Sequence, residues 1–327
     1  MGCLRVMGEL KKMPELKYYS SITAKKIEWL WYPYIPYGRI TIVQGDPGEG
    51  KTTLALNIAA LLSTGQSMPD SEIQMPPYSI IYQSTEDGLA DTVKPRLIGA
   101  GADCSRIAFI DDVIESLTLD DARIEHAILQ AEARLLILDP LQSFIGKDVD
   151  LHRANDVRPL MRGLANVAER TNCAIMVIGH MNKSVGAKGL YRGLGSIDIT
   201  AAARSVLLVG RLRDEPTIRV MTQIKNNLAP EGKAIAFELN EIDGFRWIGQ
   251  YDVTVDDILN GEKPVEESKR IQAQTIIEEM LFENQCPCTK IYAACLEHGI
   301  GKRTVDAAKQ LLGVKSLKQP DGWYWSL

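Results

Sequence analysis

The sequence predicts an α/β fold with a mostly parallel, twisted sheet, followed by a small C-terminal domain. Three observations support this prediction. Short apolar runs rich in β-branched residues alternate along the chain with stretches of helical periodicity, which is typical of a parallel sheet covered by helices. Several of these runs end in polar residues, so the chemistry is expected at one edge of the sheet. A glycine-rich loop directly follows the first run.

The glycine-rich loop belongs to the segment VQGDPGEGKTTLAL, residues 43–56, and fills every fixed position of G-x-x-x-x-G-K-[ST]. A predicted strand, residues 39–44, precedes it and an apolar helix follows. The loop N–H groups and the helix N-terminus favour phosphate oxygens. We expect Lys51 to reach the β- and γ-phosphates, and the Thr52 hydroxyl to bind Mg²⁺. The predicted cofactors are therefore ATP and Mg²⁺, and the predicted nucleotide-binding residues are Gly45, Asp46, Pro47, Gly48, Glu49, Gly50, Lys51, Thr52 and Thr53.

Four more buried strands are predicted at residues 79–83, 107–110, 135–138 and 174–179. The third is the run LLIL followed by Asp139, the pattern of a Walker B strand. Because the strand reads as buried on both faces, Asp139 is expected to emerge beside the glycine-rich loop. There it can hold Mg²⁺, through water, opposite Thr52.

The order of these motifs resembles the RecA-like ATPases, most closely the RepA-type and DnaB-like replicative helicases. The resemblance runs from about Ile22 to Gly249. It rests on the segments IVQGDPGEGKTTLAL, IIYQSTEDG, LLILDP, IMVIGHMNK, RGLGSIDITAAARS and QIKNNLAP. The first four are fairly specific together, and the last two are looser. The resemblance implies a RecA-like P-loop core.

The resemblance also implies two catalytic roles at strand ends. Glu86 occupies the position of the glutamate that polarises the attacking water, which suits a carboxylate because the water must be oriented and partly deprotonated. Asp87 is the neighbouring candidate, and a helix cap is the structural alternative for Glu86. His180 matches the polar residue that senses the γ-phosphate. A buried, hydrogen-bonded histidine is its structural alternative.

A basic, glycine-rich segment at residues 183–196 lies where RecA-like proteins place a central DNA-binding loop. Lys183, Lys188 and Arg192 are predicted to contact phosphates, and Tyr191 to stack on a base of single-stranded DNA. A solvated loop is the alternative, since basic loops are common.

Two residues are candidates for a cation that acts on the site of a neighbouring subunit. Arg204 falls where RepA-type helicases carry an arginine finger. Lys225 resembles the lysine of the DnaB-like K-x-R pattern, but Asn227 stands where that pattern has its arginine, which favours Arg204. A plain surface charge is the alternative for both. Either role requires a homo-oligomer, and the family implies a hexamer.

The C-terminal region is predicted to form a winged helix-turn-helix: helices at residues 269–282, 289–297 and 302–312, then strands at 314–317 and 322–326. It also looks like the helix-turn-helix tails of phage and mobile-element ATPases. A protein-binding winged helix is the alternative, because both uses share the fold. The residues expected to face duplex DNA are Lys302, Arg303, Thr304, Lys309, Lys315 and Lys318.

The predicted domains are a lead-in at residues 1–28, an ATPase domain at 29–258, a linker at 259–268 and the winged helix at 269–327. The net charge of −5 shows no global basic bias, so nucleic-acid contacts must use local patches. Six cysteines without a C-x-x-C pair indicate reduced thiols and no metal cluster. With no apolar run of membrane length and no signal-peptide pattern, we expect a cytoplasmic protein without membrane contact.

The sequence thus favours an oligomeric, Mg²⁺-dependent ATPase acting on DNA, as a helicase or translocase in replication of a phage or mobile element. A DNA-binding adaptor or regulator that uses ATP as an assembly switch, without unwinding, is the alternative. A small-molecule kinase is disfavoured because no acceptor pocket is legible.

Overall fold

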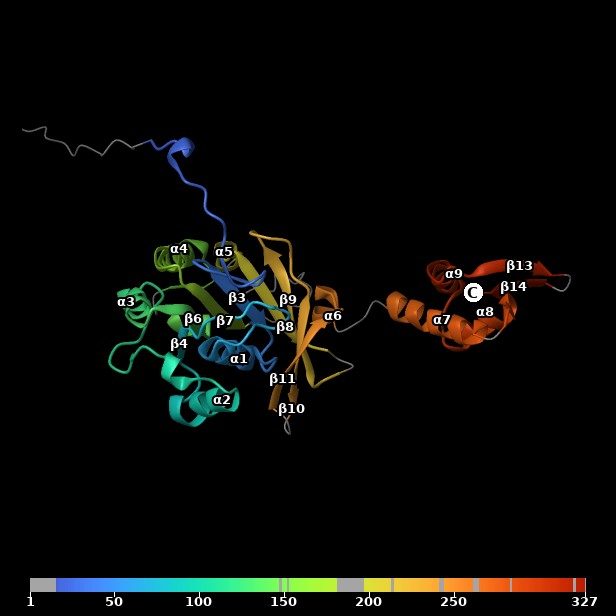
Figure 1. Ribbon diagram of the computed structural model, residues 1–327, viewed down its shortest axis with the longest axis horizontal. Coiled ribbons are helices and arrows are strands. Elements are labelled where there is room, and N and C mark those ends of the chain that lie inside the picture. The colour runs from blue at the N-terminus through green and yellow to red at the C-terminus, as the bar shows by residue number, and fades with distance from the viewer. Residues whose placement is uncertain are drawn as a thin grey trace, which may run out of the picture.

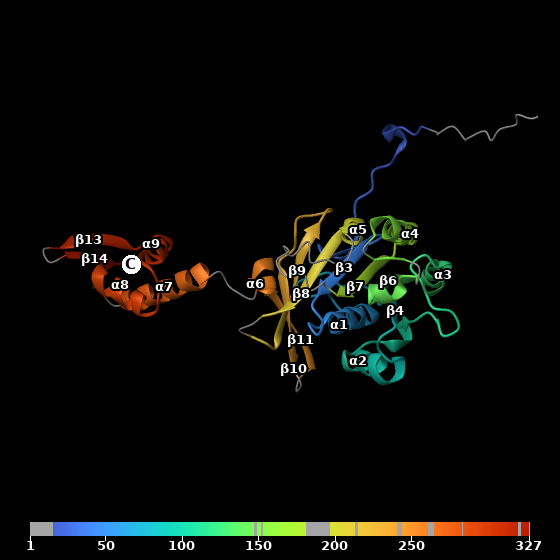
Figure 2. The same cartoon turned by 180° about the vertical axis from the view of Figure 1, so that it is seen from behind.

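The computed structural model describes residues 16–146, 149–151, 153–180, 197–212, 215–240, 244–260, 265–282, 284–319 and 322–326. Its core is a nine-stranded sheet with helices on both faces (Figures 1 and 2). The strands are β3 (Ile40–Gly45), β4 (Ser79–Ser84), β5 (Ile107–Ala108), β6 (Ala133–Asp139), β7 (Ala174–His180), β8 (Ser205–Arg211), β9 (Ile218–Asn226), β10 (Ala234–Asn240) and β11 (Gly244–Tyr251). The helices of the core are α1 (Lys51–Thr64), α2 (Lys94–Gly99), α3 (Ala122–Ala131), α4 (Ala154–Thr171), α5 (Ile197–Ala202) and α6 (Val255–Asn260).

The strand order is β11-β10-β9-β8-β3-β7-β6-β4-β5. The strands from β8 through β5 pair in parallel, whereas β9, β10 and β11 are added antiparallel at the other side. The mostly parallel sheet predicted from the sequence is therefore confirmed. In the parallel part, β3, β4, β6 and β7 end at the same edge, so the segments that follow them meet there.

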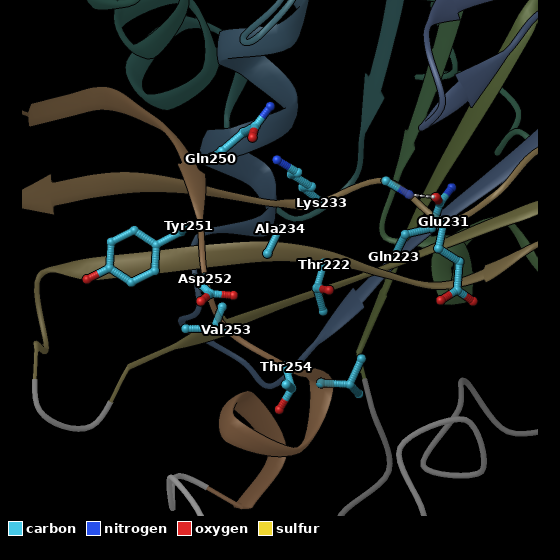
Figure 3. A pocket seen from close by; sticks show the side chains of 12 residues that line it. Thr222, Gln223, Glu231, Lys233, Ala234, Gln250, Tyr251, Asp252, Val253 and Thr254 are labelled. Carbon is cyan, nitrogen blue, oxygen red and sulfur yellow. Dashed lines mark hydrogen bonds between the residues drawn. The ribbon is translucent and has the colours of Figure 1, made fainter. Parts of the chain in front are cut away.

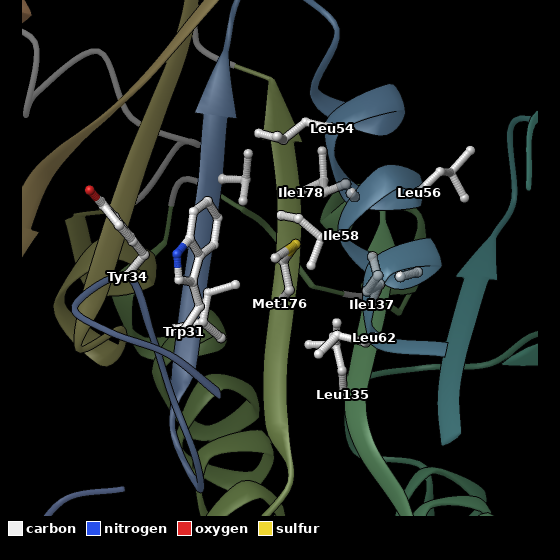
Figure 4. Close-up of a cluster of buried hydrophobic side chains, with 14 of the residues drawn as sticks. Trp31, Tyr34, Leu54, Leu56, Ile58, Leu62, Leu135, Ile137, Met176 and Ile178 are labelled. Atoms are coloured by element: carbon white, nitrogen blue, oxygen red, sulfur yellow. The ribbon is translucent and has the colours of Figure 1, made fainter. Parts of the chain in front are cut away.

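Two layers of apolar side chains enclose the sheet. Helices α1 and α2 cover one face, with the leucine and isoleucine side chains of α1 completely buried against β3, β6 and β7 (Figure 4). Helices α3, α4 and α5 cover the other face. The strands β6 and β7 are buried on both faces, which is why they read as continuous apolar runs in the sequence.

A short aromatic hairpin closes the core next to β3. It consists of β1 (Trp29–Trp31) and β2 (Ile35–Pro36), which pair antiparallel. Trp31 is 2% exposed, and its ring meets that of Trp247 of β11 edge-on at 6.2 Å. The hairpin thus joins the beginning of the core to the antiparallel strands.

The C-terminal unit has a core of its own, which includes Ile277, Ile291, Val305 and Trp325. Its helices are α7 (Val265–Leu281), α8 (Cys288–Glu297) and α9 (Lys302–Leu311), and its strands are β12 (Cys286–Pro287), β13 (Lys315–Gln319) and β14 (Gly322–Ser326). The strands form an antiparallel sheet in the order β12-β14-β13. Three helices and a terminal hairpin match the predicted elements, and the short strand β12 was not predicted.

Two predicted boundaries differ from the structure. The strand predicted at residues 107–110 is only two residues long, because β5 lies at the edge of the sheet and the chain then turns away. The segment predicted as a linker, residues 259–268, is helical at both ends: α6 runs to Asn260 and α7 begins at Val265. Acidic residues 266 and 267 stand in the first turn of α7, where they favour a helix start.

Candidate functional site

The glycine-rich loop connects β3 to α1 at the edge where the parallel strands end. Gly50 caps the start of α1 with φ of +86°, and a Cβ atom on it would lie 2.6 Å from Leu239 Cδ1 of β10. A Cβ on Gly45 would lie 2.1 Å from the carbonyl oxygen of Val209 in β8. Both glycines are therefore required by neighbouring strands, and the loop they frame leaves residues 46–48 exposed to solvent.

The Lys51 side chain is folded back under the loop and is 4% exposed. Its ammonium donates hydrogen bonds to the carbonyl oxygens of Gly45 at 2.8 Å and Asp46 at 2.7 Å. Because an ammonium has three N–H donors, these bonds leave one for a phosphate oxygen. Burial lowers the pKa of Lys51, and the nearby carboxylate of Asp139 opposes this shift.

Thr52 and Asp139, the two predicted magnesium ligands, are in direct contact. The Thr52 hydroxyl donates to Asp139 Oδ2 at 2.7 Å, and the Tyr82 hydroxyl donates to the same oxygen at 3.0 Å. Asp139 is 5% exposed. Burial raises the pKa of its carboxyl, and the hydrogen bonds from Thr52 and Tyr82 act in the opposite direction. A hydroxyl and a carboxylate at the end of a phosphate loop are the oxygen ligands that suit Mg²⁺ together with phosphate and water.

Glu86 and His180 meet across this edge. Glu86 follows β4 and is exposed, and its Oε2 lies 4.0 Å from Nε2 of His180 at the end of β7. Asp87, the neighbouring candidate, forms a hydrogen-bonded ion pair with Arg96 of α2 at 2.8 Å. Asp87 is thus engaged away from the loop, and Glu86 is the carboxylate that faces the strand ends.

Arg204 and Lys225 lie at the opposite end of the sheet from their own loop. Arg204 directly precedes β8, and its amide donates to the carbonyl oxygen of Ile40, at the start of β3. Five residues of strand separate that point from Gly45, or roughly 16 Å at 3.3 Å per residue. Neither residue is therefore placed to reach the phosphate loop of its own chain.

The two side chains differ in what they contact. The Lys225 ammonium donates to the carbonyl oxygens of Thr200 at 2.7 Å and Ala203 at 2.9 Å, at the C-terminal end of α5. Burial, and then the charge of Arg204, lowers the pKa of Lys225. The Arg204 side chain is exposed and forms no ion pair with any described residue. Its carbonyl oxygen accepts from the amide of Asn227 at 3.0 Å, so it lies beside the position where the DnaB-like pattern has its arginine.

The predicted DNA-contacting residues are only partly described. Lys183, Lys188, Tyr191 and Arg192 lie outside the described residues, as does the side chain of Arg303. In α9, Lys302 is exposed with its ammonium 5.4 Å from the centre of the Tyr292 ring. Lys309 lies 4.6 Å from the centre of the Trp325 ring and contacts Ser316. Lys315 and Lys318 are exposed on β13.

Sequence reasoning missed two contacts near the loop. Tyr82 is one, and the available signal was a hydroxyl-bearing residue inside the apolar strand IIYQS. The other is Arg211, at the end of β8, whose Nε lies 3.7 Å from Oε2 of Glu49 in the loop. Arg219 of β9 stands opposite Arg211 in the sheet and is buried. The loop is thereby tied to the antiparallel strands through an ion pair.

Two hollows lie away from the loop. A cavity of about 700 Å³ beside β9, β10 and α6 is lined by polar residues, among them Thr222, Gln223 and Lys233 (Figure 3). The Gln223 amide there is already hydrogen-bonded to Ser205 and to backbone atoms. An apolar groove of about 360 Å³ lies between α2 and β5, and the Tyr82 ring forms part of its wall. Neither hollow contains a residue predicted for the site.

Comparison with known proteins gives a consistent result. A family model described as an AAA domain matches residues 17–186. DNA repair protein RadA of Halalkalibacterium halodurans is 26% identical over 207 residues, which make up 62% of this chain and 40% of the relative. Protein RecA of a Methylobacterium species is 24% identical over 264 residues, or 76% of this chain and 69% of the relative. The chain thus spans less than half of the RadA length it matches.

Among solved structures, an ATPase domain of a DnaB-like protein has a TM-score of 0.50 at 15% identity, over 65% of this chain and 85% of that one. This likeness shows the fold, and with it the predicted RecA-like P-loop core is confirmed. In the described part of the chain, no helix is long and apolar enough to cross a membrane. Nor do the described residues contain a group of three or more His, Cys, Asp or Glu that could hold a metal ion.

Proposed function

The chain belongs to the AAA domain family, and from this premise we propose that it is an oligomeric, Mg²⁺-dependent ATPase that acts on DNA. The finer form of the proposal is a RepA-type or DnaB-like helicase or translocase that works in the cytoplasm as a hexamer. The observation that carries it is the meeting of five residues at one edge of the sheet: Lys51, Thr52, Asp139, Glu86 and His180.

Each of these residues has a role that its geometry supports. The loop N–H groups and the remaining donor of Lys51 hold the triphosphate. Thr52 and Asp139 would hold Mg²⁺, which neutralises charge on the phosphate oxygens when it is bound. Glu86, whose carboxylate is not engaged by Arg96, orients and partly deprotonates the attacking water. His180 lies 4.0 Å from Glu86 and can report the state of that carboxylate to the segment that follows β7.

We infer that the site is completed by a second subunit. Lys51, Thr52 and Asp139 bind nucleotide within one chain, but that chain's Arg204 lies at the far end of β8. An exposed guanidinium without an ion pair in the described residues is suited to neutralise transition-state charge in a neighbour. Arg204 is preferred to Lys225, because the Lys225 ammonium already holds the end of α5.

DNA as the substrate is supported by the relatives and by local charge. DNA repair is part of the printed name of the RadA relative. The segment of Lys183, Lys188 and Arg192 follows β7 directly, and so lies next in the chain to His180. The C-terminal unit presents Lys302, Lys315 and Lys318 at its surface, and a winged helix that binds duplex DNA is part of the proposal.

The first experiment is an ATPase assay with and without single-stranded DNA. We expect hydrolysis that requires Mg²⁺ and rises when DNA is added. Lys51→Ala should abolish turnover and weaken nucleotide binding, because the ammonium also meets ground-state phosphates. Turnover equal to wild type in the purified, folded variant would remove the ATPase proposal. Turnover that ignores DNA would leave an ATPase of another class.

One further observation favours the alternative of an ATP-switched DNA-binding adaptor. The C-terminal unit has its own core and its own basic surface, so it can bind DNA without help from the ATPase core. A strand-displacement assay on a forked duplex distinguishes the two functions. Displacement that depends on hydrolysis supports the helicase, whereas ATP-dependent binding of duplex without displacement supports the adaptor.

A further inference from the structure

Tyr82 makes a contact that the roles described so far do not use. It lies on β4 with its ring 2% exposed, and its hydroxyl donates to Asp139 Oδ2 at 3.0 Å. The Thr52 hydroxyl donates to the same oxygen at 2.7 Å. One carboxylate oxygen of the magnesium site is thus held by donors from two elements, α1 and β4.

The alternative explanation is that a buried hydroxyl merely needs a partner, since an unbonded one is costly. Tyr34 is the internal comparison. It is 5% exposed, and its hydroxyl donates to the backbone carbonyl of Lys233 at 2.6 Å, far along the sheet from Asp139. A neutral backbone acceptor was sufficient there. Tyr82 instead bonds the one carboxylate next to the phosphate loop, and bonds to charged acceptors are the stronger kind.

The sheet register makes the contact specific. Tyr82 pairs with Ile137 and Ser84 pairs with Asp139, so Tyr82 lies two residues below the strand end, on the face of β4 that α1 covers. From there only a side chain of tyrosine length with a terminal donor spans from the strand to the carboxylate. Phenylalanine would fill the same space without the donor.

We propose that Tyr82 is a positioning residue for the magnesium ion: its hydroxyl and that of Thr52 together hold Asp139 in the orientation that serves the ion. Removing an outer partner of a metal ligand typically weakens metal binding about 10- to 100-fold. The proposal rests on the proposed ATPase function, because it assigns the metal to Thr52 and Asp139.

The test measures metal affinity directly rather than turnover. Mn²⁺ is titrated into the full-length protein with ADP, and bound metal is followed by electron paramagnetic resonance. Tyr82→Phe should bind Mn²⁺ about 10- to 100-fold more weakly, while its affinity for ADP without metal stays at the wild-type value. Tyr34→Phe removes an equally buried hydroxyl and should leave both affinities unchanged. Tyr82→Met, which also fills the space flexibly, is the second variant should the phenylalanine variant not fold.

The outcomes separate this proposal from the one beneath it. Thr52→Val is the reference, because it removes the predicted ligand itself. Wild-type Mn²⁺ affinity in folded Tyr82→Phe, with a loss in Thr52→Val, would overturn the role of Tyr82 and leave the magnesium site intact. Wild-type affinity in both variants would overturn the placement of the metal as well. A loss in Tyr34→Phe of the same size would show a general effect of buried hydroxyls and would also overturn the proposal.

Discussion

The backbone amide of Asn227 donates a hydrogen bond to the carbonyl oxygen of Arg204 at 3.0 Å. This bond joins the end of β9 to the start of β8 and sets Arg204 beside the position where the DnaB-like pattern carries an arginine. The exposed guanidinium of Arg204 can therefore occupy the region that the side chain of residue 227 would otherwise serve. Lys225, two residues earlier, is turned onto α5 instead.

Arg204→Ala should leave nucleotide binding nearly intact and reduce hydrolysis by about 10³-fold or more, because a trans guanidinium acts mainly on transition-state charge. Mixing is the sharper measurement. Arg204→Ala has a sound loop and no finger, whereas Lys51→Ala has a sound finger and a dead loop. Mixed, the two inactive proteins should regain ATPase activity at hybrid interfaces. No recovery, with mixed oligomers demonstrated by native mass spectrometry, would exclude the Arg204 finger.

Lys225→Met should lower stability rather than catalysis. The ammonium satisfies two carbonyl oxygens at the end of α5, so its loss should cost about 1 kcal/mol, measured by urea unfolding. Hydrolysis per folded chain should remain. An inactive Lys225→Met protein of wild-type stability would instead make Lys225 the catalytic cation.

The same variant predicts a pH effect. Because the pKa of Lys225 is lowered in the folded chain, the unfolded chain binds more protons below the ordinary value of 10.5. Wild-type stability should therefore gain a contribution as pH rises toward that value, and Lys225→Met should lack it. The difference in unfolding free energy between the two proteins, measured at pH 8 and pH 10, checks the sign.

Glu86→Gln should still bind nucleotide, while hydrolysis falls by roughly 10²- to 10⁴-fold, because the amide keeps the shape but cannot act as a base. Asp87→Asn is the matched control: it loses an ion pair with Arg96 that lies partly in solvent, so it should keep most activity. Single-turnover hydrolysis and nucleotide affinity measured side by side decide the matter. Should Asp87→Asn be the inactive one, the base is one residue further along.

Replacing Lys315 and Lys318 together by glutamate should weaken binding to duplex DNA and reduce its salt dependence. Each lost phosphate contact lowers the slope of log affinity against log salt by about 0.9. Lys290→Glu, an exposed change on α8, is the control and should have little effect. Fluorescence anisotropy across a salt series gives the slope. Equal slopes in all three proteins would favour the protein-binding alternative for the C-terminal unit.

The sequence predicted those parts of the molecule that depend on local pattern. The loop from Gly45 to Thr53, the buried strand ending at Asp139 and the strand ending at His180 all appear where expected. Each is read from a short stretch, because burial on both faces of a parallel strand gives a continuous apolar run. The meeting of Glu86 with His180 followed from the rule that parallel strands end at one edge.

Contacts that depend on strand order and register were not predictable in this way. Tyr82 reads as one more buried residue of its strand, and its partner Asp139 is 57 residues away. Only the pairing of β4 with β6 brings them together. Lys225 likewise reads as a basic residue in a family position, and its role at the end of α5 depends on the antiparallel pairing of β8 with β9.

The close approach of Val209 to Gly45 has an evolutionary consequence. The atom that a Cβ would meet is a backbone oxygen, which no side-chain substitution can move. Glycine at this position is therefore demanded by the folding of the sheet, whether or not a phosphate is ever bound. A descendant that had lost its nucleotide chemistry would still keep this glycine, while Lys51 and Thr52 drifted freely. In a set of homologous chains, retention of the lysine and the threonine, rather than of the first glycine, is the mark of a working enzyme.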